Sequence, residues 1–281
     1  MRRLLCFLLC LLLLPAFCTG EESTAAETLV IHFLDVGQGD AALIQCGGQT
    51  LMIDGGDKNA NQFIYSYLSE QGLTYLDYII ATHPHDDHVK GLATALVLCD
   101  AGIVYSPVTE AEGEGFHDFI DKLAYRGGHL TVPHRGDTFS LGSATVTFLT
   151  EPQPEWSLND QSLMVKIVFG NTSFIFTGDA EWLAEQDAIA GGIDLHADVL
   201  KLGHHGSLTS TSQEFLDAVQ PKYAIISVGS GNKYGHPSDE TLLKLTHMYV
   251  SVFRTDKHGT IICTSDGENL GFVMTKKNGK W

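Results

Sequence analysis

The chain of 281 residues has few basic side chains, few cysteines and no long apolar run after its first twenty residues. Lysine and arginine together number 17 against 34 aspartates and glutamates, and the formal net charge is −17. Such a charge gives no general attraction for a long polyanion, although bound cations can create a local positive site. The same acidity is equally expected of a protein that needs only solubility outside the cell.

The first twenty residues have the composition of a secretory signal peptide. Arg2 and Arg3 precede an apolar run over residues 4–14, which is too short to span a bilayer comfortably and is followed by small residues. Cleavage is expected after Cys18 or Gly20. Anchoring through an acylated Cys18 is disfavoured, because a bulky phenylalanine precedes it.

Removal of that segment would leave one secreted or otherwise extracytoplasmic domain. The expected organisation is a signal peptide over residues 1–20, a polar leader over 21–28 and a single domain over 29–281, with no stable membrane span in the mature chain. The mature chain would keep 15 basic and all 34 acidic residues, a net charge of 15 − 34 = −19, which two divalent cations would reduce to −15.

Three cysteines lie beyond the first twenty residues, namely Cys46, Cys99 and Cys263. They allow at most one disulfide, and their wide spacing favours three small buried side chains instead. The fold therefore cannot depend on a disulfide framework, and the chain is long enough to bury a large apolar core.

Short β-like runs alternate with helical segments along the chain. Strands are expected at residues 29–36, 41–45, 50–54, 76–82, 144–149, 162–169, 172–177, 199–202 and 223–228, and helices at 61–71, 89–98, 181–190, 212–219 and 238–247. Strands that arrive in groups with helices between them predict two mixed sheets packed together with helices outside.

The run Thr82-His-Pro-His-Asp-Asp-His88 follows one of these strands and is the strongest functional signal. Imidazoles and carboxylates this close repel or desolvate one another unless a cation lies among them. His83 and His85, two apart in extended chain, would point the same way and hold one metal ion. Asp87 and His88 fall where a helix begins and would face a second. A histidine-rich surface loop is the less favoured alternative.

Two later strands end in further ligand-type residues. The first leads into Asp179, whose carboxylate could bridge two cations or simply cap the next helix. The second leads into His204 and His205, one of which should complete the second metal site. We expect His204 to be that ligand, since it is nearer the strand end, with His205 behind the ligands or in contact with substrate. The sequence leaves the opposite assignment open.

Two other positions have weaker signals. Asp54 ends a strand and could orient a ligand histidine through its other ring nitrogen, although a turn aspartate is nearly as well supported. His236 lies in a glycine-rich loop and could protonate a leaving group or hold a phosphoryl oxygen. The alternative for His236 is an exposed loop histidine without a role.

Together these motifs resemble the metallo-β-lactamase superfamily, and most closely the hydrolase domain of ComEC-type DNA-uptake competence proteins. The order His-x-His-x-Asp-His, then Gly-Asp, then a late His carries the resemblance over residues 29–263. Segments with recognisable ComEC-type counterparts are Phe33–Asp40, Asp54–Gly56, Thr177–Asp179, His204–Ser207 and Tyr234–Pro237. The resemblance implies an α+β fold, a four-layer αβ/βα sandwich with a two-metal site at one edge. It also implies metal ligands at His83, His85, Asp87, His88, Asp179 and His204, with Asp54 in support.

Two departures from that pattern concern the first metal. Many ComEC-type domains have aspartate where this chain has His85, so the first metal site is closer to the general superfamily pattern. A third histidine ligand, common in the superfamily, has no match here, and the segment 159–163 stands in its place. Asn159 is therefore expected to be a weak ligand, or else the first metal is more open. By this resemblance the chain is expected to correspond to the hydrolase module alone, without the membrane channel of ComEC.

Two divalent ions held in this way would bind a water molecule between them and lower its pKa, giving a hydroxide nucleophile. Asp87 could steer that nucleophile as well as hold metal. Zinc fits the nitrogen and oxygen ligands, and manganese is the alternative. The expected function is a secreted metal-dependent phosphodiesterase, with nucleases included in that class.

The expected substrate is a small or cell-wall phosphodiester, such as a choline-phosphate ester, or single-stranded DNA. A β-lactamase-type amide hydrolase is disfavoured, because by resemblance those enzymes lack the bridging Gly-Asp and have a third histidine. A non-catalytic metal-containing binding module is disfavoured by the intact ligand set. The sequence says nothing of the oligomeric state.

Overall fold

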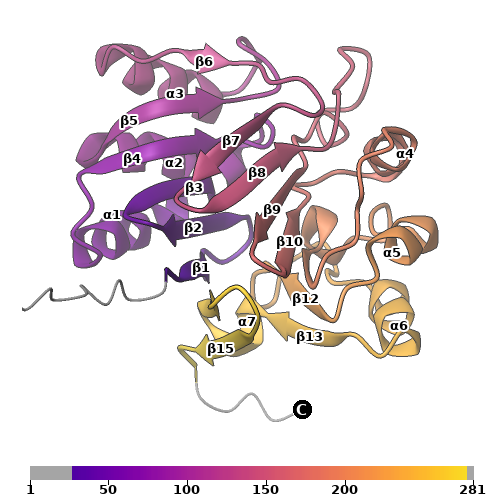
Figure 1. Cartoon of the computed structure of the whole chain (residues 1–281). Helices are drawn as coiled ribbons and strands as arrows, with labels where there is room; N and C mark the ends of the chain where they lie inside the picture. Colours follow the sequence, from indigo (N-terminus) through magenta and orange to yellow (C-terminus); the bar gives the residue numbers. More distant parts are fainter. Residues whose placement is uncertain (1–26, 277–281) are drawn as a thin grey trace, which may run out of the picture.

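Two mixed β-sheets pack face to face in the computed structural model, which describes residues 27–276 (Figure 1). The expected signal peptide and most of the polar leader lie outside the described residues. One sheet has eight strands in the order β15-β14-β1-β2-β3-β4-β5-β6, and the other has seven in the order β13-β12-β11-β10-β9-β8-β7. The prediction of two mixed sheets in an α+β fold is confirmed.

The strands of the eight-stranded sheet are β1 (Leu29–Phe33), β2 (Ala41–Cys46), β3 (Gln49–Gly55), β4 (Tyr75–Ile80), β5 (Asp100–Tyr105), β6 (Leu130–Thr131), β14 (Ile261–Ser265) and β15 (Leu270–Met274). Those of the seven-stranded sheet are β7 (Thr138–Leu141), β8 (Ala144–Phe148), β9 (Val165–Phe169), β10 (Thr172–Phe176), β11 (Val199–Lys201), β12 (Tyr223–Ile226) and β13 (Ser251–Arg254).

Helices cover the outer face of each sheet (Figure 1). The first sheet is covered by α1 (Asn61–Glu70), α2 (Asp86–Leu98) and α3 (Glu114–Tyr125), and the second by α4 (Trp182–Ala190), α5 (Gln213–Val219) and α6 (Asp239–His247). Three shorter helices are η1 (Lys58–Ala60), η2 (Gly203–Gly206) and α7 (Thr255–His258). None of the helices within residues 27–276 is long and apolar enough to cross a membrane.

Alternation along the strands produces three apolar layers. In β2, Ala42 and Ile44 face the opposite sheet, whereas Leu43 between them faces the helices. In β10, Phe174 and Phe176 face inward and Ile175 faces outward in the same way. Successive side chains of a strand point to opposite faces, so a strand buried on both faces is apolar throughout.

The three cysteines within the described residues are buried and free, as their spacing indicated. The sequence patterns missed α3, the strands β5 to β7 and β13 to β15, and they placed the start of α2 too late. Helix α2 begins at Asp86, so Asp87 and His88 lie in its first turn. Two aspartates in a first turn are favourable, because the backbone N–H groups there carry partial positive charge.

Candidate metal centre

The histidine cluster lies where β4 ends and α2 begins. His83 and His88 are completely buried, and His85 precedes the first residue of α2 in extended backbone. The Nε2 atom of His83 is 3.0 Å from the Nδ1 atom of His85. The rings of His83 and His88 are 4.1 Å apart between centroids. The strand-to-helix turn thus gathers three imidazoles on one side of the chain.

Asp179 brings a carboxylate from the second sheet into this cluster. It follows β10, and one of its oxygens lies 3.3 Å from His88 Nε2, while the other lies 3.9 Å from His83 Nε2. The backbone N–H of Asp179 donates to Ser162 Oγ, whose hydroxyl also contacts His83 Nδ1 at 3.4 Å. The Asp179 carboxylate is therefore held beside the imidazoles of His83 and His88.

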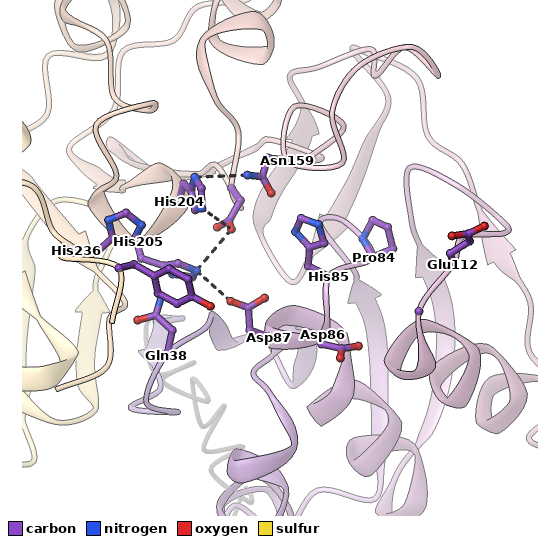
Figure 2. Close-up of a pocket in the computed structure, with 13 residues that line it drawn as sticks. Gln38, Pro84, His85, Asp86, Asp87, Glu112, Asn159, His204, His205 and His236 are labelled. Atoms are coloured by element: carbon purple, nitrogen blue, oxygen red, sulfur yellow. Dashed lines mark hydrogen bonds and ion pairs between the residues drawn. The ribbon is translucent and has the colours of Figure 1, made fainter. Parts of the chain in front are cut away.

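His205 reaches deeper into the centre than His204. The Nε2 atom of His205 lies 3.4 Å from Asp87 Oδ2 and 3.5 Å from Asp179 Oδ2, and the residue is 2% exposed. His204 Nε2 is 3.9 Å from Asp179 Oδ2, and its side chain is 26% exposed. Figure 2 shows His204 and His205 facing Asp87 and His85 across the cavity. The geometry favours the assignment in which His205, not His204, would face a second cation.

His204 is instead held at the rim of the cavity. Its Nδ1 atom contacts Glu181 Oε1 at 3.0 Å and Thr209 Oγ1 at 3.3 Å. Asn159 lines the cavity beside it, with its amide nitrogen 3.3 Å from Glu181 and 3.5 Å from His204 Nδ1. The ring of His236 lies 5.4 Å from that of His204 between centroids. Asn159, His204 and His236 therefore share one rim.

Asp54 supports the centre from behind. Its Oδ2 atom accepts from His88 Nδ1 at 2.8 Å and from the Thr82 hydroxyl at 2.7 Å, and its Oδ1 atom accepts from the Thr82 backbone N–H at 2.8 Å. With the proton of His88 on Nδ1, the lone pair of Nε2 faces Asp179. Asp54 has the orienting position that the sequence suggested for it.

The sequence patterns missed a buried ion pair next to the centre. Lys201 at the end of β11 donates to Asp40 Oδ2, and the other oxygen of Asp40 lies 3.2 Å from His205 Nδ1. A lysine inside an otherwise apolar strand was the available signal. Glu181 was missed as well, because nothing in the sequence indicates that it lies against His204.

The buried carboxylates of the centre stabilise the protonated forms of two of its histidines. Burial alone would lower the pKa of His88, but Asp179 and Asp54 outweigh burial and hold that pKa well above its ordinary value. Burial would also lower the pKa of His205, but the carboxylates of Asp179, Asp40 and Asp87 outweigh it and raise that pKa to about 9. Burial lowers the pKa of His83 well below its ordinary value. Positive charge at the centre of these groups is what a divalent cation would supply.

Three buried atoms that face one another here make no hydrogen bond, namely His88 Nε2, His205 Nε2 and Asp179 Oδ1. Buried polar atoms are normally satisfied, so a cluster of such atoms calls for an explanation. Within the described part of the chain, ligand-type atoms of His83, His88 and Asp179, and likewise of Asp87, His88 and His205, lie within 4.8 Å of one another. Mixed nitrogen and oxygen donors at this spacing fit divalent cations such as zinc.

The centre opens into a cavity of about 450 Å³. The residues that line it are Gln38, Pro84, His85, Asp86, Asp87, Glu112, Gly113, Asn159, Asp179, His204, His205, Tyr234 and His236 (Figure 2). This lining has three aspartates, one glutamate and four histidines, but neither lysine nor arginine. Apart from its histidines, the lining offers no positive group to an anionic substrate, which bound cations would therefore have to supply.

Comparison with known proteins agrees with the fold and the motifs. Residues 34–230 match the family described as the Metallo-beta-lactamase superfamily. ComE operon protein 3 of Bacillus subtilis (strain 168) is 30% identical over 257 residues, which cover 82% of this chain and 32% of that protein. Competence protein ComA of Neisseria gonorrhoeae is 28% identical over 255 residues, covering 89% of this chain and 34% of that protein. The chain thus spans about a third of the length of these relatives.

Among solved structures, the metallo-beta-lactamase fold protein YhfI from Bacillus subtilis superposes with a TM-score of 0.57 at 14% identity, covering 84% of this chain and 100% of that one. This likeness concerns the fold. The match over residues 34–230 covers well over half of the sequence, and the competence proteins confirm the resemblance to ComEC-type domains. The chain therefore belongs to the metallo-β-lactamase superfamily of metal-dependent hydrolases.

Proposed function

We propose that this chain is a phosphodiesterase with a two-metal centre. The observation that carries the proposal is that Asp179 lies close both to His83, a ligand of one cation, and to His88 and His205, ligands of the other. His83, His85 and Asp179 would hold one cation, and the other ligands would hold the second, with His205 in the place first expected of His204. When bound, two divalent cations activate a water molecule and offset negative charge on phosphoryl oxygens.

The surrounding side chains would divide the remaining work. Asp87 Oδ2, which lies 3.4 Å from His205 Nε2, would orient the attacking water as well as hold metal. His204 and His236 lie together on the rim and would contact the phosphoryl or leaving-group oxygens. Asn159 would complete the first metal site weakly or contact substrate.

A small or cell-wall phosphodiester is the substrate class that the charges favour. The cavity has no lysine or arginine among its lining residues, which include Asp86 and Glu112. A polyanion would meet these carboxylates beyond the one phosphate that the cations neutralise. Single-stranded DNA is the second candidate, and it is favoured by the likeness to competence proteins.

The test offers three substrates to zinc- or manganese-loaded protein: bis-p-nitrophenyl phosphate, single-stranded DNA and a cephalosporin. We expect hydrolysis of the diester, loss of activity with a chelator and recovery when metal is returned. The Asp87→Ala/His88→Ala variant should lose activity by more than about 100-fold while remaining folded. His117→Ala, which changes an exposed histidine outside the centre, is the matched control. Turnover of the cephalosporin alone, or full activity of the double variant, would refute the proposal.

We also propose that the protein acts outside the cytoplasm, because residues 1–20 have the composition of a signal peptide. Mass spectrometry of the protein recovered from the cell envelope or the medium would show at which residue the chain begins. A chain that begins near residue 19 or 21 supports export, and an intact chain confined to the cytoplasm contradicts it.

A further inference from the structure

A buried lysine connects the two sheets directly behind the metal centre. Lys201 ends β11 in the seven-stranded sheet, and Asp40 immediately precedes β2 in the eight-stranded sheet. Their side chains are only 4% and 8% exposed. The ammonium group donates to Asp40 Oδ2 and lies 3.5 Å from the carbonyl oxygen of Gly178, next to Asp179. A buried ion pair of this kind costs free energy to desolvate, so we expect it to serve a function at the centre.

The free oxygen of Asp40 faces a ligand-type histidine. Asp40 Oδ1 lies 3.2 Å from His205 Nδ1, and the carbonyl oxygen of Ser227 lies 3.0 Å from the same nitrogen. Two oxygens around Nδ1 favour the tautomer with its proton there, which leaves the lone pair of Nε2 for the centre. The hydrogen bond from Nδ1 goes to the Ser227 carbonyl, and the Asp40 carboxylate lies beside it as a charged partner of the ring. Carboxylates close to the outer nitrogen of a metal-binding histidine commonly help to orient it.

The backbone of His205 does not hold the ring by itself. Its φ is 55°, in the left-handed region that non-glycine residues rarely adopt, and the preceding His204 has a φ of 46°. A ring on such a turn needs contacts from outside its own segment to stay in place. Asp40 is 165 positions away in the sequence (205 − 40). Backbone hydrogen bonds with Asp87 and Gly56 hold its main chain, and Lys201 binds its carboxylate.

We propose that Lys201 and Asp40 are positioning residues that keep His205 directed at the second cation. This inference rests on the two-metal centre proposed above. The ion pair anchors Asp40, Asp40 orients the His205 ring, and the ring completes the group formed with Asp87 and His88.

The effect should be confined to one half of the centre. His83 is held by Thr82 and Ser162, at 3.1 Å and 3.4 Å from its Nδ1 atom, and neither contact involves the ion pair. His88 is held separately by Asp54 at 2.8 Å. Loss of the pair should therefore weaken one metal equivalent and spare the other.

The main test titrates metal-free protein with zinc by calorimetry and counts bound zinc per chain. The Asp40→Leu/Lys201→Met variant replaces both charges with apolar side chains, so that neither is left buried alone. We expect its weaker zinc equivalent to bind about 10–100-fold less tightly, with the tighter equivalent within about threefold of the wild type.

Lys166→Met is the matched control. Lys166 is a second buried lysine of the same sheet, paired at 3.0 Å with Asp194, and it has no contact with the centre. The Lys166→Met variant should bind both zinc equivalents like the wild type, even if its melting temperature is lower. A folded double variant that binds both equivalents normally would overturn the inference.

A measurement on the wild type covers the case in which the double variant does not fold. In the zinc-loaded protein, long-range proton–nitrogen spectra should show the His205 ring protonated at Nδ1, with the ring assigned through the loss of its signal in His205→Asn. Protonation at Nε2 instead would overturn the inference.

Failure of the underlying proposal looks different. Wild-type protein that binds fewer than two zinc equivalents would overturn the two-metal centre and this inference with it. Wild-type protein that binds two and cleaves no diester would overturn only the phosphodiesterase activity, because the zinc affinities still measure the role of Lys201.

Discussion

At the scale of single residues, three of the six non-glycine residues with positive φ within the described chain belong to the candidate metal centre. Asp54, His204 and His205 all have positive φ, at 56°, 46° and 55°. Non-glycine residues in this region cost about 1–3 kcal/mol each and persist where the surrounding structure holds them. Here the holding contacts are the bonds of Asp54 to Thr82, of His204 to Glu181 and of His205 to Ser227. These three residues are therefore placed for chemistry at a cost to stability.

The structure makes a direct prediction about the two adjacent histidines. His205→Asn should reduce bound zinc by one equivalent and lower activity by more than about 100-fold, because it removes a buried nitrogen facing Asp87 and Asp179. His204→Asn should keep both zinc equivalents and lower activity less. Metal analysis of the two purified variants decides between them. Loss of zinc from His204→Asn alone would restore the assignment first made from the sequence.

Asp54 provides a second prediction at this scale. Asp54→Asn should weaken binding of the zinc held by His88 by about 10–100-fold, because a neutral amide orients the imidazole less well than a carboxylate. Competition with a coloured chelator measures the change. Asp118→Asn, an exposed aspartate on α3, should leave zinc affinity unaltered. Equal affinities in wild type and Asp54→Asn would show that Asp54 has no orienting role.

At the scale of whole elements, glycines set the distance between α2 and the strands. A Cβ atom on Gly91 of α2 would lie 1.8 Å from the carbonyl oxygen of Gly55 in β3, and one on Gly39 would lie 2.3 Å from that of Asp87. The Gly91 N–H also donates to Gly56 at 3.0 Å. This close approach places His88 on α2 within reach of Asp54 on β3.

Gly91→Ala tests that packing. The added methyl group meets backbone rather than a movable side chain, so we expect a loss of about 1–3 kcal/mol in the free energy of unfolding, together with weaker zinc binding. Urea denaturation of the metal-free protein measures the first and calorimetry the second. Val97→Ala, at a 53% exposed position of the same helix, should change stability by no more than about 0.5 kcal/mol. A Gly91→Ala variant as stable as wild type would mean that α2 shifts without cost.

At the scale of the whole molecule, the centre lies where the two sheets meet. The ends of β3 and β4 supply Asp54 and His83, and the ends of β10 and β11 lead to Asp179 and His205. Within each pair the strands are parallel neighbours, so their carboxyl ends lie at the same edge of a sheet. Packing the sheets face to face brings the two edges together, and neither sheet could form the centre alone.

The net charge of −17 leads to a prediction about salt. Raising the ionic strength from about 0.02 M to 0.2 M should increase kcat/KM for bis-p-nitrophenyl phosphate by about twofold or more, because salt screens the repulsion of an anionic substrate. Initial rates at low substrate concentration, with zinc held constant, give this ratio. A steep fall in kcat/KM would instead indicate a basic binding track and would favour single-stranded DNA.

The sequence by itself determined the family, the two-sheet class and most of the residues that the centre brings together. His83, His85, Asp87 and His88 are local to one turn, and Asp179 follows an apolar strand, so short-range patterns were enough to find them. Only the tertiary structure distinguishes His204 from His205, because neighbouring residues differ in direction through the backbone angles of one turn, and it brings His205 closer to Asp87 and Asp179. It alone revealed the pair of Asp40 and Lys201, which are 161 positions apart and meet only when two sheets pack. Local chemistry can be read along a chain, whereas contacts between distant segments depend on packing that no short pattern specifies.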